Sequence, residues 1–356
     1  MRVATVVGNR PQFVKAAAVS RLLREHHDEV LVHTGQHYDD EMSRVFFDEL
    51  PIPAPDRQLG VGSGAAAVQT ARMLEALEGV LREIEPALVL VYGDTNSTLA
   101  GALAAAQARV PVAHVEAGMR SFDRAMPEEL NRVLTDHASD LLLCSTETAI
   151  ANLAREGIEA GVHLVGDAMA DVALATARVA RSRSDVLEGF GVEPGGYLLV
   201  TAHRAGNVDA PERLAMLVEL LLSLPRPLVF PVHPRTRARL EAAGLLAALE
   251  EAPGVHLSAP VGYVELLALA IGARAVVTDS GGLQKEAYLV EVPCVTLRDT
   301  TEWVETVETG WNVLVDLDAA AAQAALDRPP PADHPDLYGG GRAGERIRDV
   351  IDAFGA

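Results

Sequence analysis

The sequence alternates short apolar runs with helical segments along most of its length, and polar motifs follow the apolar runs. Residues 2–7 and 87–91 are such runs in the first half, and residues 197–201 and 227–232 repeat the pattern in the second half. Strands that alternate with helices in this way form parallel βαβ units. Ligands of such sheets bind beyond the carboxyl ends of the strands. The sequence therefore predicts an α/β protein whose functional residues follow its strands.

The strand–helix pattern restarts after a turn-rich break at residues 193–196, which read EPGG. A chain of 356 residues is long for one hydrophobic core and suits two domains of ordinary size. We therefore expect two Rossmann-like domains, over residues 1–168 and 169–340. A Pro-rich segment near 327–341 precedes a last helix, expected within residues 341–356.

The overall charge and hydropathy exclude several classes of protein. The formal net charge of −20 argues against a general nucleic-acid surface or an anionic-membrane surface. The longest apolar runs are shorter than a membrane span, and Met1 opens directly into a strand without a signal peptide, so we expect a cytoplasmic protein. Cys144 and Cys294 each lie in an apolar run and are expected to be buried free thiols.

Residues 276–303 place a strand end, a glycine pair and a helix start in direct succession. The turn 279–282, which reads DSGG, follows an apolar run, and a helical segment begins at about Leu283. Free N–H groups at a helix N-terminus bind anions, and glycines let a phosphate approach them. Glu286 lies about one turn into this helix, where a carboxylate can bind a ribose diol. The stretch is either a nucleotide-phosphate site or an ordinary strand–turn–helix.

Two basic residues and one acidic residue in the first half follow strands. Arg10 stands at a strand-to-helix turn and Lys15 in the next helix, where both can face a diphosphate or an oxyanion. Arg10 taken alone is equally compatible with a solvated loop cation. Asp94 follows Gly93 and is either a site carboxylate or the N-cap of the following helix.

Three further candidates are Glu116, Glu128 and His203. Glu116 follows an apolar strand and precedes a glycine, whereas Glu128 stands at a helix start that the helix dipole alone would favour. His203 stands at the end of a strand. It is a phosphate partner, an acid/base group or a structural histidine. The sequence holds no Ser/His/Asp nucleophile pattern, no metal-spaced Cys/His cluster, no Walker loop and no GxGxxG within residues 1–20. The set suits proton transfer on a sugar nucleotide without a metal or an external cofactor.

Eight strings carry a family resemblance: GNRPQFVK (8–15), HTGQHYD (33–39), YGDTNST (92–98), HVEAGMRS (114–121), MPEELNR (126–132), AHRAGN (202–207), TDSGGLQKEA (278–287) and RDTTEW (298–303). Along nearly its whole length the chain resembles the non-hydrolysing UDP-N-acetylglucosamine 2-epimerases, which share the GT-B glycosyltransferase fold. The resemblance implies two Rossmann-like domains facing across a cleft, with the sugar on the first domain and UDP on the second. It also implies that residues 341–356 form a helix that packs back on the first domain.

The resemblance assigns a role to each matching residue. Catalytic positions are implied for Lys15, Asp94, Glu116, Glu128 and His203, and substrate-binding positions for Arg10, Val261, Leu266, Ser280, Gly281, Gly282 and Glu286. In this assignment the serine and the two glycines hold the diphosphate, Glu286 holds the ribose, and the backbone near Val261 holds the uracil. The implied reaction inverts carbon 2 of the sugar through 2-acetamidoglucal and UDP. A homodimer is implied as well.

The sequence departs from the family pattern at two positions. Gly206 stands where the family often has Glu, and Trp303 where it often has Arg. The segment after HTGQHYD lacks the Gln of members that are activated by UDP-N-acetylglucosamine, so we do not expect that regulation. The strings PQFVKAAAVSRLL and RSFDRAMPEELNRVLTDHASDLL resemble the subgroup that includes epimerases of UDP-2,3-diacetamido-glucuronic acid. Other functions left open are a hydrolysing epimerase, a GT-B glycosyltransferase and an inactive sugar-nucleotide sensor.

Overall fold

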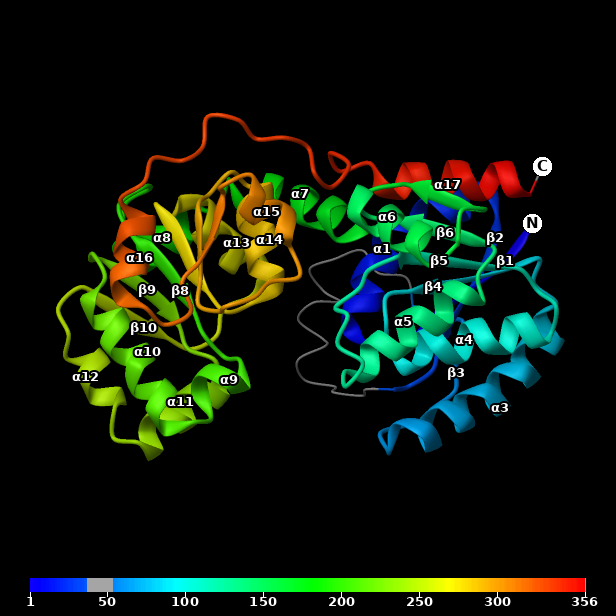
Figure 1. Cartoon of the computed structure of the whole chain (residues 1–356), viewed down its shortest axis with the longest axis horizontal. Helices are drawn as coiled ribbons and strands as arrows, with labels where there is room; N and C mark the ends of the chain where they lie inside the picture. Colours follow the sequence, from blue (N-terminus) through cyan, green and yellow to red (C-terminus); the bar gives the residue numbers. More distant parts are fainter. Residues whose placement is uncertain (37–53, 356) are drawn as a thin grey trace. The chain divides into compact units, whose positions relative to one another are not determined.

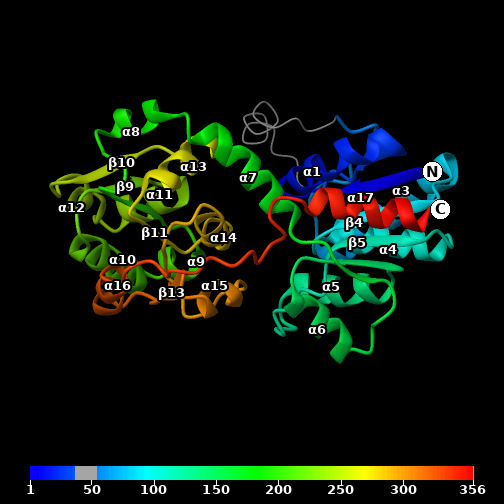
Figure 2. The ribbon, with the colours of Figure 1, turned by 90° about the horizontal axis from the view of Figure 1, so that it is seen from above.

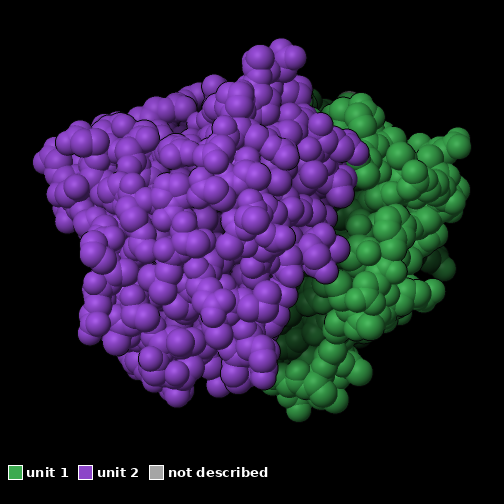
Figure 3. Space-filling view, turned by 60° about the vertical axis from the view of Figure 1, so that its left-hand side comes forward, with its two compact units in different colours: residues 1–172, 336–356 green, residues 173–335 purple. Residues whose placement is uncertain are grey.

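The computed structural model describes residues 1–36 and 54–355, except for the side chain of Arg10. The chain divides into two compact units, which Figure 3 colours separately. Unit 1 comprises residues 1–172 and 336–356, and unit 2 comprises residues 173–335. Helix α7 (Ala168–Ala180) contains the first point at which the chain passes from one unit to the other.

Unit 1 is built on a parallel sheet of seven strands in the order β3-β2-β1-β4-β5-β6-β7. The strands are β1 (Arg2–Val7), β2 (Asp28–His33), β3 (Arg57–Gln58), β4 (Leu88–Tyr92), β5 (Val112–Ala117), β6 (Leu141–Cys144) and β7 (Val162–Leu164). The helices are α1 (Arg10–His26), α3 (Ala66–Ile84), α4 (Asn96–Gln107), α5 (Pro127–His137), α6 (Glu147–Arg155) and α17 (Ala343–Phe354). Every residue of β4 is buried, as expected for a strand with helices on both faces.

Alternate side chains of β1 point to opposite faces of this sheet. Val3 and Val7 pack against α1 and α17, whereas Ala4 and Val6 pack against α3 and α4. Both ribbon views show α17 beside α1 (Figures 1 and 2). A Cβ at Gly344 would stand 2.7 Å from the carbonyl oxygen of Ala18, so glycine permits this close helix contact. The last helix therefore packs within unit 1.

Unit 2 repeats the architecture with six parallel strands in the order β10-β9-β8-β11-β12-β13. The strands are β8 (Leu198–Thr201), β9 (Leu228–Pro231), β10 (Val255–Ser258), β11 (Ala275–Thr278), β12 (Cys294–Thr296) and β13 (Asn312–Leu314). The helices are α8 (Ser184–Phe190), α9 (Ala205–Val208), α10 (Pro211–Ser223), α11 (Pro234–Ala242), α12 (Leu246–Glu250), α13 (Tyr263–Gly272), α14 (Gly281–Leu289), α15 (Val304–Glu308) and α16 (Ala319–Leu326).

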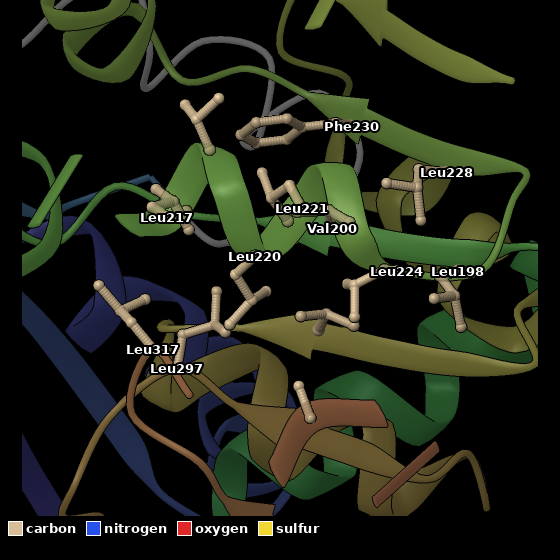
Figure 4. Close-up of a cluster of buried hydrophobic side chains, with 14 of the residues drawn as sticks. Leu198, Val200, Leu217, Leu220, Leu221, Leu224, Leu228, Phe230, Leu297 and Leu317 are labelled. Atoms are coloured by element: carbon tan, nitrogen blue, oxygen red, sulfur yellow. The ribbon is translucent and has the colours of Figure 1, made fainter. Parts of the chain in front are cut away.

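The core of unit 2 has one layer on each face of its sheet. On one face, leucines of α10 such as Leu217 and Leu221 pack on Val200 and Phe230 of the strands (Figure 4). On the other face, helices α13 and α14 pack on residues such as Leu199 and Val276. Both sheets thus have the strand order of a Rossmann fold, which confirms the predicted α/β class.

The structure refines the sequence expectations at two places. Helix α14 begins at Gly281 rather than at about Leu283, because Ser280 is its N-cap and accepts a hydrogen bond from the Leu283 N–H. Cys144 and Cys294 are buried and free, as predicted. None of the helices in the described part of the chain is both long enough and apolar enough to cross a membrane.

Candidate active site

The candidate residues of unit 1 lie at or just beyond the carboxyl ends of β1, β4 and β5, including the helices α1 and α5 that follow β1 and β5. Strands β1 and β4 are neighbours in the sheet, so the strand order reverses between them, which is where open α/β sheets bind ligands. Gln12 joins the loops that follow these two strands. Its Oε1 accepts from the Gly8 N–H at 2.7 Å, and its Nε2 donates to the carbonyl of Tyr92 at 2.6 Å. The loop that carries Asp94 is thereby fixed against the start of α1.

Glu116 is the bulge residue of β5. The register of β5 against β6 shifts between Val115 and Ala117, and Glu116 has φ of 70°, a left-handed conformation that is uncommon for residues other than glycine. A carboxylate oxygen of Glu116 pairs with the ammonium group of Lys15 on α1. Such backbone strain costs about 1–3 kcal/mol and clusters at active sites. The strained conformation therefore makes Glu116 a candidate site carboxylate.

Lys15 is a fixed positive charge beside this carboxylate. Burial alone would lower the pKa of Lys15, but Glu116, and more weakly Asp94 and Asp167, raise the pKa above its ordinary value. Gly93 lies against the pair, since a Cβ there would stand 3.2 Å from Glu116 Oε2 and 3.3 Å from Lys15 Nζ. Because Lys15 stays protonated at neutral pH, it stabilises negative charge and does not act as a base.

Asp94 supplies a second carboxylate to this cluster. Its Oδ2 accepts from the guanidinium of Arg132 at 2.5 Å, and its carbonyl accepts from the side chain of Asn131 at 2.9 Å. The alternative that Asp94 caps α4 is wrong, because Thr95 is the N-cap and accepts from the N–H of Thr98. The Asp94 side chain is one-third exposed and remains accessible to a ligand.

The first turn of α5 carries two glutamates with different surroundings. Glu129 is buried and accepts from the backbone N–H groups of Ser121 and Phe122 at 2.8 and 3.0 Å. Burial alone would raise the pKa of Glu129, but these hydrogen bonds and Arg132 lower it. Glu128 is exposed, and the structure records no hydrogen bond or ion pair for it within the described residues. The structure thus brings Lys15, Asp94 and Glu116 together but leaves Glu128 outside their contacts.

A cavity of about 280 Å³ opens beyond the carboxyl ends of β8, β9 and β11 in unit 2. This volume is near the lower end of the range for small-molecule sites. Strands β8 and β11 flank the point at which the strand order reverses in this sheet. The residues that line the cavity include Thr201, His203, His233, Val261, Tyr263, Leu266, Ser280, Gly282 and Glu286. The predicted nucleotide-binding residues therefore converge here, with Gly281 adjacent to them in the chain.

Asp279 organises one wall of this cavity. It is fully buried, and its carboxylate accepts from the backbone N–H groups of His203 and Arg204 at 3.0 Å and from the side chain of Asn207 at 3.2 Å. The loop after β8 is thus tied to the end of β11. The His203 side chain is two-fifths exposed, and its ring centroid lies 5.3 Å from that of His233. His203 is therefore held in place but accessible.

Glu286 projects from α14 into the cavity and accepts a hydrogen bond from the hydroxyl of Tyr263 at 2.9 Å. Burial raises the pKa of Glu286 above its ordinary value, and the opposing effects of Tyr263 and Lys285 do not cancel this. The second carboxylate oxygen has no such partner among the hydrogen bonds of the described residues. A ribose diol is a donor of the kind that this carboxylate accepts.

The N-terminus of α14 faces a group of charged side chains. A Cβ at Gly281 would stand 3.4 Å from Glu302, 3.5 Å from Arg204 and 3.5 Å from the indole nitrogen of Trp303. The ammonium of Lys285 lies 4.3 Å from the centroid of the Trp303 ring, in a cation–π contact. The tryptophan that departs from the family pattern is therefore a partner of Lys285. Gly206, the other departure, has open space around it.

Sequence reasoning missed several residues that build these two sites. Arg132, Asp279 and His233 were not proposed, although Arg132 closes the string MPEELNR and Asp279 directly precedes Ser280. Their contacts join residues far apart in the chain, which single motifs do not reveal. Within the described residues, no group of three or more His, Cys, Asp or Glu side chains is placed to hold a metal ion. The Arg10 side chain and the segment after HTGQ lie outside the described residues.

The chain matches known proteins over almost its full length. Residues 21–352 match the family model of UDP-N-acetylglucosamine 2-epimerase. A UDP-N-acetylglucosamine 2-epimerase homolog of Methanococcus maripaludis is 47% identical over 354 residues, covering 99% of both chains. The UDP-2,3-diacetamido-2,3-dideoxy-D-glucuronate 2-epimerase of Pseudomonas aeruginosa is 47% identical over 363 residues, with the same coverage.

The fold also matches solved structures. The crystal structure of the Methanocaldococcus jannaschii UDP-GlcNAc 2-epimerase in complex with UDP-GlcNAc and UDP is 41% identical, with a TM-score of 0.84. The match covers 99% of this chain and 100% of that one, so the two Rossmann-like units belong to the GT-B class. Sequence and fold together show that the chain is a member of the UDP-N-acetylglucosamine 2-epimerase family.

Proposed function

We propose that the protein interconverts UDP-N-acetylglucosamine and UDP-N-acetylmannosamine by inverting carbon 2 of the sugar. The observation that carries the proposal is the cluster at the strand ends of unit 1, in which Asp94 and a strained Glu116 stand beside a protonated Lys15. Carboxylates in such a place can remove a proton at carbon 2 and return one. The cavity of unit 2 supplies the complementary nucleotide site.

Unit 2 is proposed to bind the UDP part of the substrate. The diphosphate would accept hydrogen bonds from the backbone N–H groups at the start of α14, where Gly281 and Gly282 leave room for a close approach. His203 would contact the same phosphates from the end of β8. The uracil would lie against Val261 and Leu266, and the ribose would donate to Glu286.

The proposed reaction proceeds by elimination and re-addition. A carboxylate of unit 1 takes the carbon-2 proton while the carbon-1–oxygen bond breaks, which gives 2-acetamidoglucal and UDP. Protonation of carbon 2 on the opposite face and attack of UDP on carbon 1 then give the epimer. Lys15 pairs with Glu116 and orients its carboxylate, and His203 with the α14 N-terminus stabilises the charge that develops on the departing diphosphate.

The substrate assignment is tested by incubating the protein separately with UDP-N-acetylglucosamine and with UDP-2,3-diacetamido-glucuronic acid. The proposal expects UDP-N-acetylmannosamine to form from the first nucleotide sugar, as observed by NMR. Faster conversion of the second would assign the protein to the diacetamido-glucuronate reaction. Free N-acetylmannosamine together with UDP would show a hydrolysing epimerase, and no conversion of either compound would contradict the proposal.

The affinity for UDP is expected to fall as the pH is lowered. The fall should begin at a higher pH than the one at which an ordinary glutamate takes up a proton. Glu286 binds the ribose as a carboxylate, and because its pKa is raised, it takes up a proton at a higher pH than an ordinary glutamate. Isothermal titration calorimetry of UDP between pH 4.5 and 8, a range set about the ordinary glutamate pKa, measures the effect. The phosphates of UDP titrate in the same range, so Glu286→Gln is the control. If wild type and Glu286→Gln show the same pH dependence, Glu286 does not bind the ribose as a carboxylate.

We also propose that the protein is a cytoplasmic homodimer, as the family resemblance implies. Size-exclusion chromatography with light scattering tests the oligomeric state. A single species with the mass of one 37.8 kDa chain would contradict the dimer.

A further inference from the structure

His114 contacts the loop that carries Asp94 directly and reaches the loop after β5 through Asp136. It is a fully buried residue of β5, two positions before Glu116. Its Nε2 lies 2.7 Å from the carbonyl oxygen of Gly93, directly before Asp94. Its Nδ1 lies 2.6 Å from Oδ1 of Asp136 on α5. The imidazole therefore bridges the loop after β4 and the helix that follows β5.

The partners of His114 fix how its ring is oriented. A backbone carbonyl only accepts hydrogen bonds, so Nε2 donates to Gly93. Nδ1 faces the carboxylate of Asp136, whose pKa burial alone would raise but His114 and Arg120 hold below its ordinary value. Arg120 pairs with Asp136 at 2.7 Å and with Glu156 at 2.7 Å, so the buried carboxylate is held from two sides.

The same network restrains both sides of the Glu116 bulge. Oδ2 of Asp136 accepts from the Gly118 N–H at 3.1 Å, two residues after Glu116. On the other side, the Gly93 N–H donates to the carbonyl of Val115 at 3.0 Å. With the His114 bond to the Gly93 carbonyl, these hydrogen bonds hold the backbone at Val115 before Glu116, at Gly118 after it, and at Gly93 before Asp94. Such restraint is what keeps a strained backbone in place.

We propose that His114, buried and hydrogen-bonded to Asp136 and to the Gly93 carbonyl, is a positioning residue that fixes the Asp94 loop against the Glu116 bulge for proton transfer. This rests on the proposed function, since the two carboxylates are its proton-transfer groups. His114 does not touch the substrate and acts through the geometry of these carboxylates. Displacing reacting groups by about 1 Å costs about 100-fold in rate.

The kinetic test compares His114→Gln with wild type. We expect kcat to fall about 100-fold, while KM and the affinity for UDP stay unchanged because UDP binds in unit 2. His163→Gln, in the edge strand β7 of the same sheet, is the matched control and should retain wild-type kcat. Wild-type kcat in His114→Gln would overturn the proposal. So would a loss of UDP affinity equal to the loss of kcat, which would indicate a general structural defect.

A second measurement needs no variant and remains decisive if His114→Gln does not fold. Protein labelled with ¹⁵N-histidine is examined by ¹H–¹⁵N NMR at neutral pH, and His114 is assigned by contacts to Val91 and Leu142, its partners in the sheet. We expect a slowly exchanging Nε2–H proton, because this group donates to the Gly93 carbonyl inside the protein, and a ring whose Nε2 carries no proton would overturn the proposal. This result is independent of turnover. A wild-type protein that converts no UDP-sugar would contradict the proposed function, not the hydrogen bond from His114 to Gly93.

Discussion

Replacing Glu116 by glutamine is expected to lower kcat for epimerisation about 1000-fold and to leave the affinity for UDP unchanged. The substitution keeps the size of the side chain and removes its ability to carry a proton to or from carbon 2. The loss follows from the position of Glu116, which the β5 bulge directs at Lys15 and Gly93. The nucleotide cavity is formed by residues of unit 2 and is not altered by the change.

Steady-state kinetics and UDP calorimetry on the same preparations measure the Glu116→Gln effect. Glu159→Gln, at an exposed position of unit 1, is the matched control and should behave as wild type. A Glu116→Gln enzyme with near-wild-type kcat would show that the strained carboxylate is not a proton-transfer group. A parallel loss of UDP affinity would show instead that the substitution disturbs the whole protein.

Replacing Gly282 by valine is expected to weaken UDP binding by about 100-fold or more, which corresponds to about 3 kcal/mol and to two charged hydrogen bonds. A Cβ at Gly282 would meet only the hydroxyl of Ser280, at 3.8 Å, so the fold tolerates a Cβ at this position. Gly282 lines the cavity, however, and the valine methyl groups would occupy the space through which a phosphate approaches the N-terminus of α14.

Calorimetry with UDP tests the Gly282→Val prediction without requiring turnover. Gly189→Val on α8 is the control, because a Cβ at that position has no neighbour within 4 Å. The control is expected to bind UDP as wild type does. Undiminished affinity in a folded Gly282→Val protein would mean that the diphosphate binds elsewhere.

The fold class was predictable because strand–helix alternation and strand-end motifs are local properties of the sequence. Strands β4 (Leu88–Tyr92) and β11 (Ala275–Thr278) are buried on both faces, and their apolar runs therefore predict strands. The succession of a strand end, the DSGG turn and a helical segment predicted the helix N-terminus, and the structure shows that Ser280 caps it. The helix starts two residues early because the glycines themselves form its first turn.

The detailed geometry of the site was less predictable, because it depends on contacts between distant residues. At the bulge, Glu116 adopts a left-handed backbone conformation, which residues other than glycine rarely adopt. No local sequence preference indicates this conformation. The Asp94–Arg132 pair joins residues 38 apart. The first turn of α5 carries Glu128 and Glu129 side by side, and only packing decides that Glu129 is the buried one.

The most direct test of the proposed chemistry is an NMR time course of the protein with UDP-N-acetylglucosamine in deuterated water. Elimination followed by re-addition removes the carbon-2 proton and replaces it from solvent. The account predicts UDP-N-acetylmannosamine that carries deuterium at carbon 2, formed without added nicotinamide cofactor or metal ion. Epimerised product that retains the original carbon-2 hydrogen, or no epimerised product, would contradict it.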